Sequence, residues 1–280
     1  DIVHHNVAQV PLAKNKKLFN SVNLIGAKIL TDQNKKVGVK SVVYTSTSAI
    51  YGVPKINPVT SQTDPAPAEE YGRAKYEAEK IFTSLMDNGI NLAIIRPRTI
   101  LGTGRLGIFQ ILFEWIYQGK NIPVLGKGDN LYQFVHALDL ASACIAAGEK
   151  KINGIYNIGA KEFCSMREAL EGVIKHAKTK SKVVGVNKSL AKACMNITSS
   201  LGLSPLGSYH SLMYGESMYF DISNAIKDLD YKPIYSNEKM FQESYDWYLK
   251  NRDKILSGII HGSGHQSKLR QGILSLTPYL

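Results

Sequence analysis

The sequence has few cysteines, no long apolar run and no acidic surplus. Its three cysteines, Cys144, Cys164 and Cys194, are odd in number and widely spaced, which fits neither a disulfide framework nor a metal site. We therefore expect free thiols in a reducing, cytoplasmic compartment and no bound metal. No stretch approaches the roughly 18–20 apolar residues that a membrane span needs. The N-terminus also shows no signal peptide.

The charge balance is basic, with a formal net charge of +11 over 280 residues. Lysines and arginines are scattered along the chain rather than gathered in one motif. A basic balance suits anionic ligands, whereas nucleic-acid binding lacks a helix-turn-helix, zinc or aromatic RNA signature. The charge balance therefore favours an anionic substrate or a weakly attracted anionic surface, and we expect no nucleic acid.

The pattern of apolar residues alternates between strands and helices. Strands are predicted at 1–10, 41–45 and 91–96, and helices at 15–36 and 68–88, with Gly38 ending the first helix. This alternation is typical of parallel βαβ units with helices on both faces of one sheet. Ligands of such sheets bind outside the carboxyl ends of the strands. Further helices are expected at 108–118, 165–177 and 238–252, and further strands at 154–159 and 181–186.

One stretch carries the candidate chemistry. A buried strand ends in the hydroxyl cluster Thr45-Ser46-Thr47-Ser48, and the later helix places Tyr71 and Lys75 four residues apart on one face. A tyrosine is a poor base at neutral pH, but a nearby cation favours its phenolate. Together with the hydroxyl of Thr47 or Ser46, this pair can deprotonate an alcohol while a hydride leaves its carbon.

The segments Thr-Ser-Thr-Ser-Ala-Ile-Tyr-Gly and Tyr-Gly-Arg-Ala-Lys resemble the extended short-chain dehydrogenase/reductases, the NAD-dependent (UDP-glucose 4-epimerase-like) epimerases and dehydratases. The resemblance runs from Asp1 to about Asp253 and selects Thr47 as the catalytic hydroxyl. It implies an α/β fold: a doubly wound, Rossmann-like parallel sheet, truncated at its N-terminal part, with a smaller C-terminal α/β substrate-binding lobe. The expected domains are 1–101, 102–255 with some elements returning to the sheet, and a tail at 256–280.

The resemblance also implies the site residues. Thr47, Tyr71 and Lys75 are the expected catalytic residues, with NAD, or alternatively NADP, as cofactor. The expected cofactor contacts are Val7, Ala8, Asn23, Thr45, Ser46, Tyr71, Lys75, Pro97 and Arg98. The expected substrate contacts are Gln9, Thr47, Thr99 and Arg105. Asn23 lies in an apolar stripe, where it would be buried and would need partners.

Gly102-Thr103-Gly104-Arg105-Leu106-Gly107 matches the dinucleotide pattern G-x-G-x-x-G, but no carboxylate ends the next strand. We interpret this stretch as a substrate loop with Arg105 as a phosphate contact. The glycine fingerprint of the family, and the residue that discriminates NAD from NADP, would lie upstream of Asp1. We therefore expect the chain to be part of a longer protein.

Other family-like segments follow, at 132–141, 154–159 and 220–233; within them we interpret His136 and Asp139 as structural, as we do His4 and His5. Two arginines that grip a diphosphate in the family are absent near Tyr132 and at 214–217. This departure leaves open a 3β-hydroxysteroid-type or other small-molecule ketoreductase, with an apolar pocket from helix 108–118. A third reading is a non-catalytic scaffold without cofactor. A homodimer is expected from the resemblance, and membrane contact only through the tail.

Overall fold

The structure is a computed structural model that describes residues 1–9, 19–189, 191, 193 and 214–259. These residues divide into two compact units. The first comprises Asp1–Thr99, Leu138–Gly159 and Tyr219–Ile234, and the second comprises the described residues of Ile100–Ala137, Ala160–Met218 and Tyr235–Leu280. The start of the predicted helix at 15–36, Cys194, and residues 260–280 of the expected tail lie outside the described residues.

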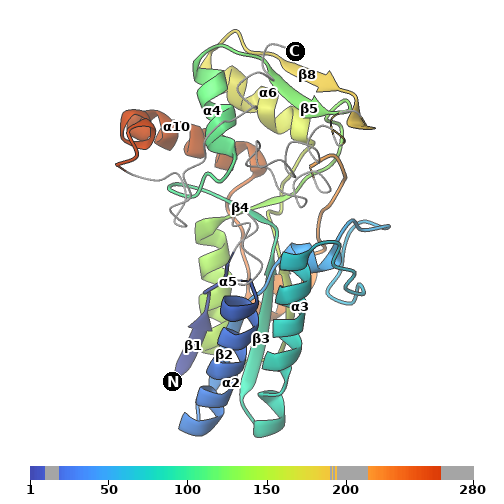
Figure 1. The fold of residues 1–280 in the computed structure, drawn as a ribbon, viewed down its shortest axis with the longest axis vertical. Helices are drawn as coiled ribbons and strands as arrows, with labels where there is room; N and C mark the ends of the chain where they lie inside the picture. The colour runs from blue at the N-terminus through green and yellow to red at the C-terminus, as the bar shows by residue number, and fades with distance from the viewer. Residues whose placement is uncertain (10–18, 190, 192, 194–213, 260–280) are drawn as a thin grey trace. The chain divides into compact units, whose positions relative to one another are not determined.

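A parallel four-stranded sheet forms the centre of the first unit. Its strands are β1 (Ile2–His5), β2 (Ser41–Thr45), β3 (Asn91–Pro97) and β7 (Gly154–Ile158), in the order β1-β2-β3-β7 (Figure 1). Every adjacent pair is parallel. The strand at 41–45 is confirmed to the residue, and the α/β class with a parallel sheet is confirmed as well.

Helices cover both faces of this sheet, as predicted. The π-helix η1 (Phe19–Ile25) leads into α2 (Gly26–Val37), and α2 packs beside α3 (Glu70–Thr83) on one face (Figure 1). On that face the Phe82 ring of α3 lies 4.4 Å from the Tyr44 ring of β2. The opposite face is covered by α5 (Ala137–Lys150), where Gly148 lies against Ile2 and His4. Because successive side chains of a strand point to opposite faces, the contacts of α3 and of α5 lie on opposite faces of the sheet.

Short elements complete the first unit. The 3₁₀ turn η2 (Ser48–Tyr51) follows β2, η3 (Met86–Asn88) follows α3, and α9 (Ser223–Leu229) comes late in the chain. Gly38 ends α2 in the left-handed conformation, as predicted. The α3 helix ends at Thr83 rather than at 88. The reason is local, because the hydroxyls of Thr83 and Ser84 donate to the backbone carbonyls of Glu79 and Ile81 and compete with helical hydrogen bonds.

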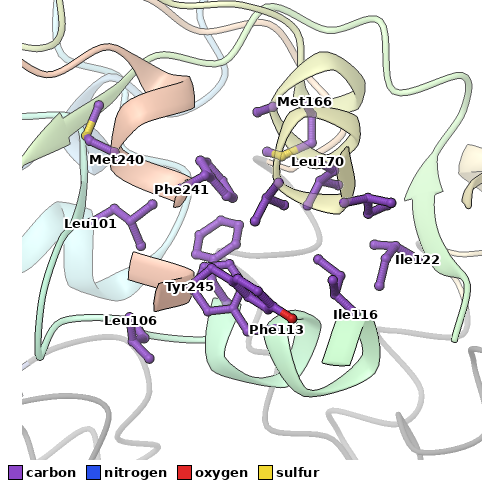
Figure 2. Close-up of a cluster of buried hydrophobic side chains, with 14 of the residues drawn as sticks. Leu101, Leu106, Phe113, Ile116, Ile122, Met166, Leu170, Met240, Phe241 and Tyr245 are labelled. Carbon is purple, nitrogen blue, oxygen red and sulfur yellow. The ribbon is translucent and has the colours of Figure 1, made fainter. Parts of the chain in front are cut away.

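The described residues of the second unit include two small sheets and three helices. Strands β5 (Ile122–Leu125) and β8 (Val183–Val186) pair in parallel, and β4 (Thr99–Leu101) pairs with β6 (Phe134–His136). The helices are α4 (Phe109–Tyr117), α6 (Met166–Ala177) and α10 (Asn237–Leu256). Figure 2 shows Phe113, Phe241 and Tyr245 meeting in the core between them.

The apolar residues of α4 are packed rather than lining a pocket. Phe109, Phe113, Trp115 and Ile116 are buried in the core of the second unit, while Tyr117 is exposed. The ketoreductase alternative assigned the apolar side chains of this helix to a substrate pocket, but most of them pack in the core instead. None of the described helices combines the length and hydropathy needed to cross a bilayer.

Gly72 provides the sharpest test of this packing. An alanine Cβ at Gly72 would lie 2.5 Å from the carbonyl oxygen of Ala49 in η2, whereas at Gly26 in α2 the nearest atom, the carbonyl oxygen of Ser21, is 3.7 Å away. Alanine normally stabilises a helix by roughly 0.5–1 kcal/mol relative to glycine. Gly72→Ala should instead destabilise the protein by about 1–3 kcal/mol through overpacking, while Gly26→Ala should be neutral or stabilising. Urea denaturation measures both, and an equally stable Gly72→Ala variant would disprove the close approach of α3 to η2.

Candidate active site

The first turn of α3 carries the tyrosine and lysine of the predicted pair. Glu69 caps this turn, because its carboxylate oxygens accept from the backbone N–H groups of Tyr71 at 2.7 Å and Gly72 at 2.6 Å. Burial raises the pKa of Glu69, and these two hydrogen bonds oppose that rise. Tyr71 and Lys75 both belong to the buried face of the helix, with 9% and 1% of their surfaces exposed. The predicted placement on one helical face is confirmed.

Lys75 is a buried ammonium at the carboxyl end of β2. Its Nζ donates to the carbonyl oxygen of Thr45 at 2.7 Å and lies 4.2 Å from the centroid of the Tyr44 ring. Burial lowers the pKa of Lys75 to about 7, against the attraction of the Glu79 carboxylate. Lys75 is thereby fixed beside the hydroxyl cluster with a charge that changes near neutral pH.

Thr47 occupies the turn between β2 and η2. Its Oγ1 accepts from the backbone N–H of Ala49 at 3.2 Å and so caps η2. The carbonyl of the same Ala49 is the atom against which Gly72 packs. Thr47 and the first turn of α3 are therefore both held against η2, and their shared catalytic role stays a prediction.

Two further hydroxyls end β2. Ser46 is 4% exposed, and its buried Oγ has no hydrogen-bond partner among the described residues. A buried hydroxyl without a partner costs free energy that a bound ligand can recover. Thr45 Oγ1 donates to Asn6 Oδ1 at 2.5 Å and lies 3.9 Å from Cys144 Sγ of α5. The expected contacts Thr45 and Ser46 thus stand at the carboxyl end of β2.

The turn after β1 is held by Asn23 of η1. Asn23 is 3% exposed, as predicted, and its amide binds the backbone of Gln9 twice, accepting at 2.9 Å and donating at 3.2 Å. Val7 and Ala8 lie just before this anchored residue, and Val7 is 65% exposed. Asn23 therefore positions the backbone at the end of β1, and direct contact between its side chain and a cofactor stays a prediction.

The buried side chain of Arg98 holds the carboxyl end of β3. Pro97 ends β3, and the next residue, Arg98, is 1% exposed. The Arg98 guanidinium donates to Ser48 Oγ at 3.0 Å and lies 5.7 Å from the centroid of the Phe220 ring. Arg98 thus ties β3 to η2. Its predicted contact with a cofactor, and that of Thr99 with a substrate, stay predictions.

Arg105 belongs to the second unit. The glycine-rich stretch forms a turn there, in which the backbone N–H of Arg105 donates to the Gly102 carbonyl at 3.0 Å. Gly104 and Gly107 adopt positive φ values of 69° and 54°, which favour glycine. The turn leads into α4. Its role as a substrate loop stays a prediction.

Sequence reasoning missed several residues around Lys75. His5, interpreted as structural, has its ring stacked 5.6 Å from that of Tyr44, and burial together with the charge of Lys75 lowers the pKa of His5 to about 4. Burial also raises the pKa of Tyr44. Asn6, which holds Thr45, stands directly after β1, and a polar residue at a strand end is the signal that could have identified it.

Comparison with known proteins identifies relatives of this chain by sequence. The family model described as the NAD dependent epimerase/dehydratase family matches residues 1–159. The uncharacterized protein y4nG of Sinorhizobium fredii is 54% identical over 280 residues, which cover 100% of this chain and 70% of y4nG. A putative UDP-glucose 4-epimerase of Methanocaldococcus jannaschii is 28% identical over 188 residues, which cover 63% of this chain and 60% of that protein.

Solved structures share the fold. The UDP-glucuronic acid 4-epimerase of Bacillus cereus, crystallised with NAD, superposes with a TM-score of 0.72 at 22% identity, over 89% of this chain and 74% of that one. The Rossmann-like α/β architecture expected from the sequence is thereby confirmed.

The buried ammonium has a measurable consequence for stability. Because burial lowers the pKa of Lys75 from 10.5 to about 7, the unfolded chain binds more protons here than the folded chain between those pH values. The free energy of unfolding should therefore rise with pH across this window, by at most about 1.4 kcal/mol per pH unit from this group. Urea denaturation of the parent and of Lys75→Met at intervals across the window measures the rise.

Lys75→Met should lack this rise, whereas Lys80→Met, which removes an exposed lysine of the same helix, should keep it. Parallel pH profiles of the parent and Lys75→Met would show that Lys75 does not titrate in this window.

Proposed function

The chain belongs to the NAD-dependent epimerase/dehydratase family, and we propose that it acts on a nucleotide sugar with NAD as its cofactor. The observation that carries this proposal is the buried pair Tyr71 and Lys75, held against the hydroxyl-rich end of β2. The matching family model supports the cofactor, and the relative from Methanocaldococcus jannaschii supports the substrate class.

The residues at the strand ends fit a dinucleotide. Ser46 has a buried hydroxyl without a partner in the described part of the chain, and Lys75 has a buried ammonium. In the proposed site Lys75 holds ribose hydroxyls, and the backbone at Val7 and Ala8 lies along the cofactor. Thr45, Ser46, Pro97 and Arg98 complete this side. When bound, NAD supplies the hydride acceptor and donor that an alcohol–ketone interconversion needs.

The protein side chains move the proton. Tyr71 takes the proton of a sugar hydroxyl, and the Lys75 ammonium favours the phenolate that makes this possible. Thr47 accepts from the Ala49 N–H through its oxygen, and in the proposed site its hydroxyl donates to the substrate oxygen and orients it. Gln9, Thr99 and Arg105 are the proposed substrate contacts. A ketoreductase of the same family would use the same Tyr71 and Lys75 on another substrate, with net hydride transfer between that substrate and the cofactor.

Two properties of the whole protein are part of the proposal. We infer a cytoplasmic location, which agrees with the free thiols of Cys144 and Cys164. We also infer a homodimer. Size-exclusion chromatography with light scattering tests the second point.

Tyr71→Phe tests the assignment of the base. The variant keeps the ring but loses the phenol, so kcat with UDP-glucose should fall by at least about 100-fold, while NAD binding is retained. Tyr76→Phe is the matched control on the same helix, where the Tyr76 ring lies against Lys80 instead, and it should keep full activity. Near-normal kcat in Tyr71→Phe would show that another group is the base.

Thermal denaturation of the full-length protein with NAD tests the cofactor. A ligand that binds the folded state stabilises it by RT ln(1 + [L]/Kd), so Tm should rise steadily with NAD concentration. No rise at millimolar NAD would remove both enzyme readings and leave the scaffold. Turnover of a hydroxysteroid without turnover of UDP-glucose would favour the ketoreductase.

A further inference from the structure

A second pair of charges is buried one helical turn beyond Lys75. Glu79 of α3 and Arg96 of β3 are each 3% exposed. The Arg96 guanidinium donates twice to the Glu79 carboxylate, from Nε at 3.0 Å and from Nη2 at 2.6 Å. Its third nitrogen, Nη1, donates to the hydroxyl of Tyr51 at 2.7 Å. All three guanidinium nitrogens are therefore engaged.

Joining α3 to β3 does not by itself account for the ion pair between Glu79 and Arg96. Removing two charges from water costs several kcal/mol per ion, and well-packed apolar residues often do the same structural task at no loss. The network extends to two further elements, η2 through Tyr51 and β7 through Asn157, because the Tyr51 hydroxyl donates to Asn157 Oδ1 at 2.9 Å. It fixes the Glu79 carboxylate beside Arg96, whose charge it compensates.

Lys75 is a second cation on which the charge of the Glu79 carboxylate acts. Lys75 and Glu79 are four residues apart on the buried face of α3, which brings their side chains into neighbouring positions. Among the described residues, the contacts of the Lys75 ammonium are with neutral groups, the Thr45 carbonyl and the Tyr44 ring. An ammonium removed from water needs an opposite charge to persist. Glu79 supplies it, and Arg96 holds that carboxylate in place.

We propose that Glu79, fixed by Arg96, is a positioning residue that keeps the Lys75 ammonium charged inside the site. The inference deepens the proposed function and rests on it only for its catalytic meaning. Within the described residues Glu79 forms an ion pair with Arg96 and none with Lys75, so Glu79 acts on Lys75 through its field rather than by direct contact. Lys75 then stays free to face Thr45 and a ligand, instead of turning along α3 toward Glu79.

Other ionisable groups around Lys75 stabilise its charged form less than Glu79 does, or destabilise it. Tyr71 shares its helix, Tyr44 lies under it from β2, and His5 of β1 is neutral at pH 7 because burial and Lys75 lower its pKa to about 4. Arg96 faces the same layer from β3 and Tyr51 from η2. Cys144 approaches from α5 on the opposite face of the sheet. The η1 helix contributes no acidic or basic residue in its terminal turns.

The experiment is a direct titration of Lys75 by NMR. Protein labelled with ¹³C at the lysine Cε is titrated with pH, and the Lys75 signal is assigned by its loss in Lys75→Met. Glu79→Gln should lower the titration midpoint of Lys75 by about one pH unit or more, because an opposite charge nearby is removed. A midpoint unchanged from the parent would overturn the proposal.

The second unit offers a matched control. Glu114 of α4 is also a buried carboxylate that binds an arginine fork, with Arg252 donating at 2.8 and 2.7 Å, and a tyrosine hydroxyl, that of Tyr248. Glu114→Gln removes the same chemistry elsewhere, so the Lys75 midpoint should stay where it is in the parent. A Lys75 shift as large as that in Glu79→Gln would mean that any buried charge loss causes it, and would overturn the proposal.

A further variant guards against misfolding, since Glu79→Gln leaves the Arg96 charge buried without its partner. Glu79→Gln combined with Arg96→Met removes both charges and should still lower the Lys75 midpoint. An unchanged midpoint in this folded double variant would equally overturn the proposal. The titration needs no substrate and no NAD, so its failure bears on this inference alone, whereas absence of stabilisation by NAD bears on the proposed function.

Discussion

The hydrogen bond from Lys75 Nζ to the carbonyl oxygen of Thr45 joins the two segments that carry the proposed chemistry. One end belongs to the helix that holds the phenol, and the other to the strand that ends in hydroxyls. A lysine ammonium is stable inside a protein only when its hydrogen bonds and charge are compensated. The Tyr44 ring and Glu79 provide further compensation, so the position of α3 on the sheet and the state of Lys75 depend on one another.

Close backbone contact makes this arrangement possible. The absence of a side chain at Gly72 lets the first turn of α3 approach the Ala49 carbonyl, and the Glu69 carboxylate caps that turn from the side. On the strand side, Arg98 fixes η2 through Ser48. The tyrosine, the lysine and the threonine therefore stand on backbone segments that are each held by a neighbouring element, which is the pre-organisation that catalysis needs.

Local patterns were enough to predict much of this structure. The strand at 41–45, the end of α2 at Gly38 and the common face of Tyr71 and Lys75 follow from periodicity and glycine conformation, which act over a few residues. The burial of Asn23 also followed from its apolar stripe, but its partner did not, because Gln9 lies 14 residues away.

Arg96 marks the limit of such reasoning in the site itself. An arginine within the apolar run Ile94-Ile95-Arg96 signals a buried charge, yet only the fold shows that its partner is Glu79 on a different element. The same holds for His5 and Asn6, which reach β2 only after the sheet has formed. Contacts between distant segments decide the electrostatics of the site, and the sequence alone carries little trace of them.

The two units are interleaved along the chain, which crosses between them after Thr99, Ala137, Gly159, Met218 and Ile234. During synthesis, the first three strands of the parallel sheet leave the ribosome well before β7 and α9 can join them. β3 therefore keeps an unpaired edge until β7 has been made. For the same reason, neither unit can be excised as a contiguous fragment, and a fusion or circular permutation must respect every crossing.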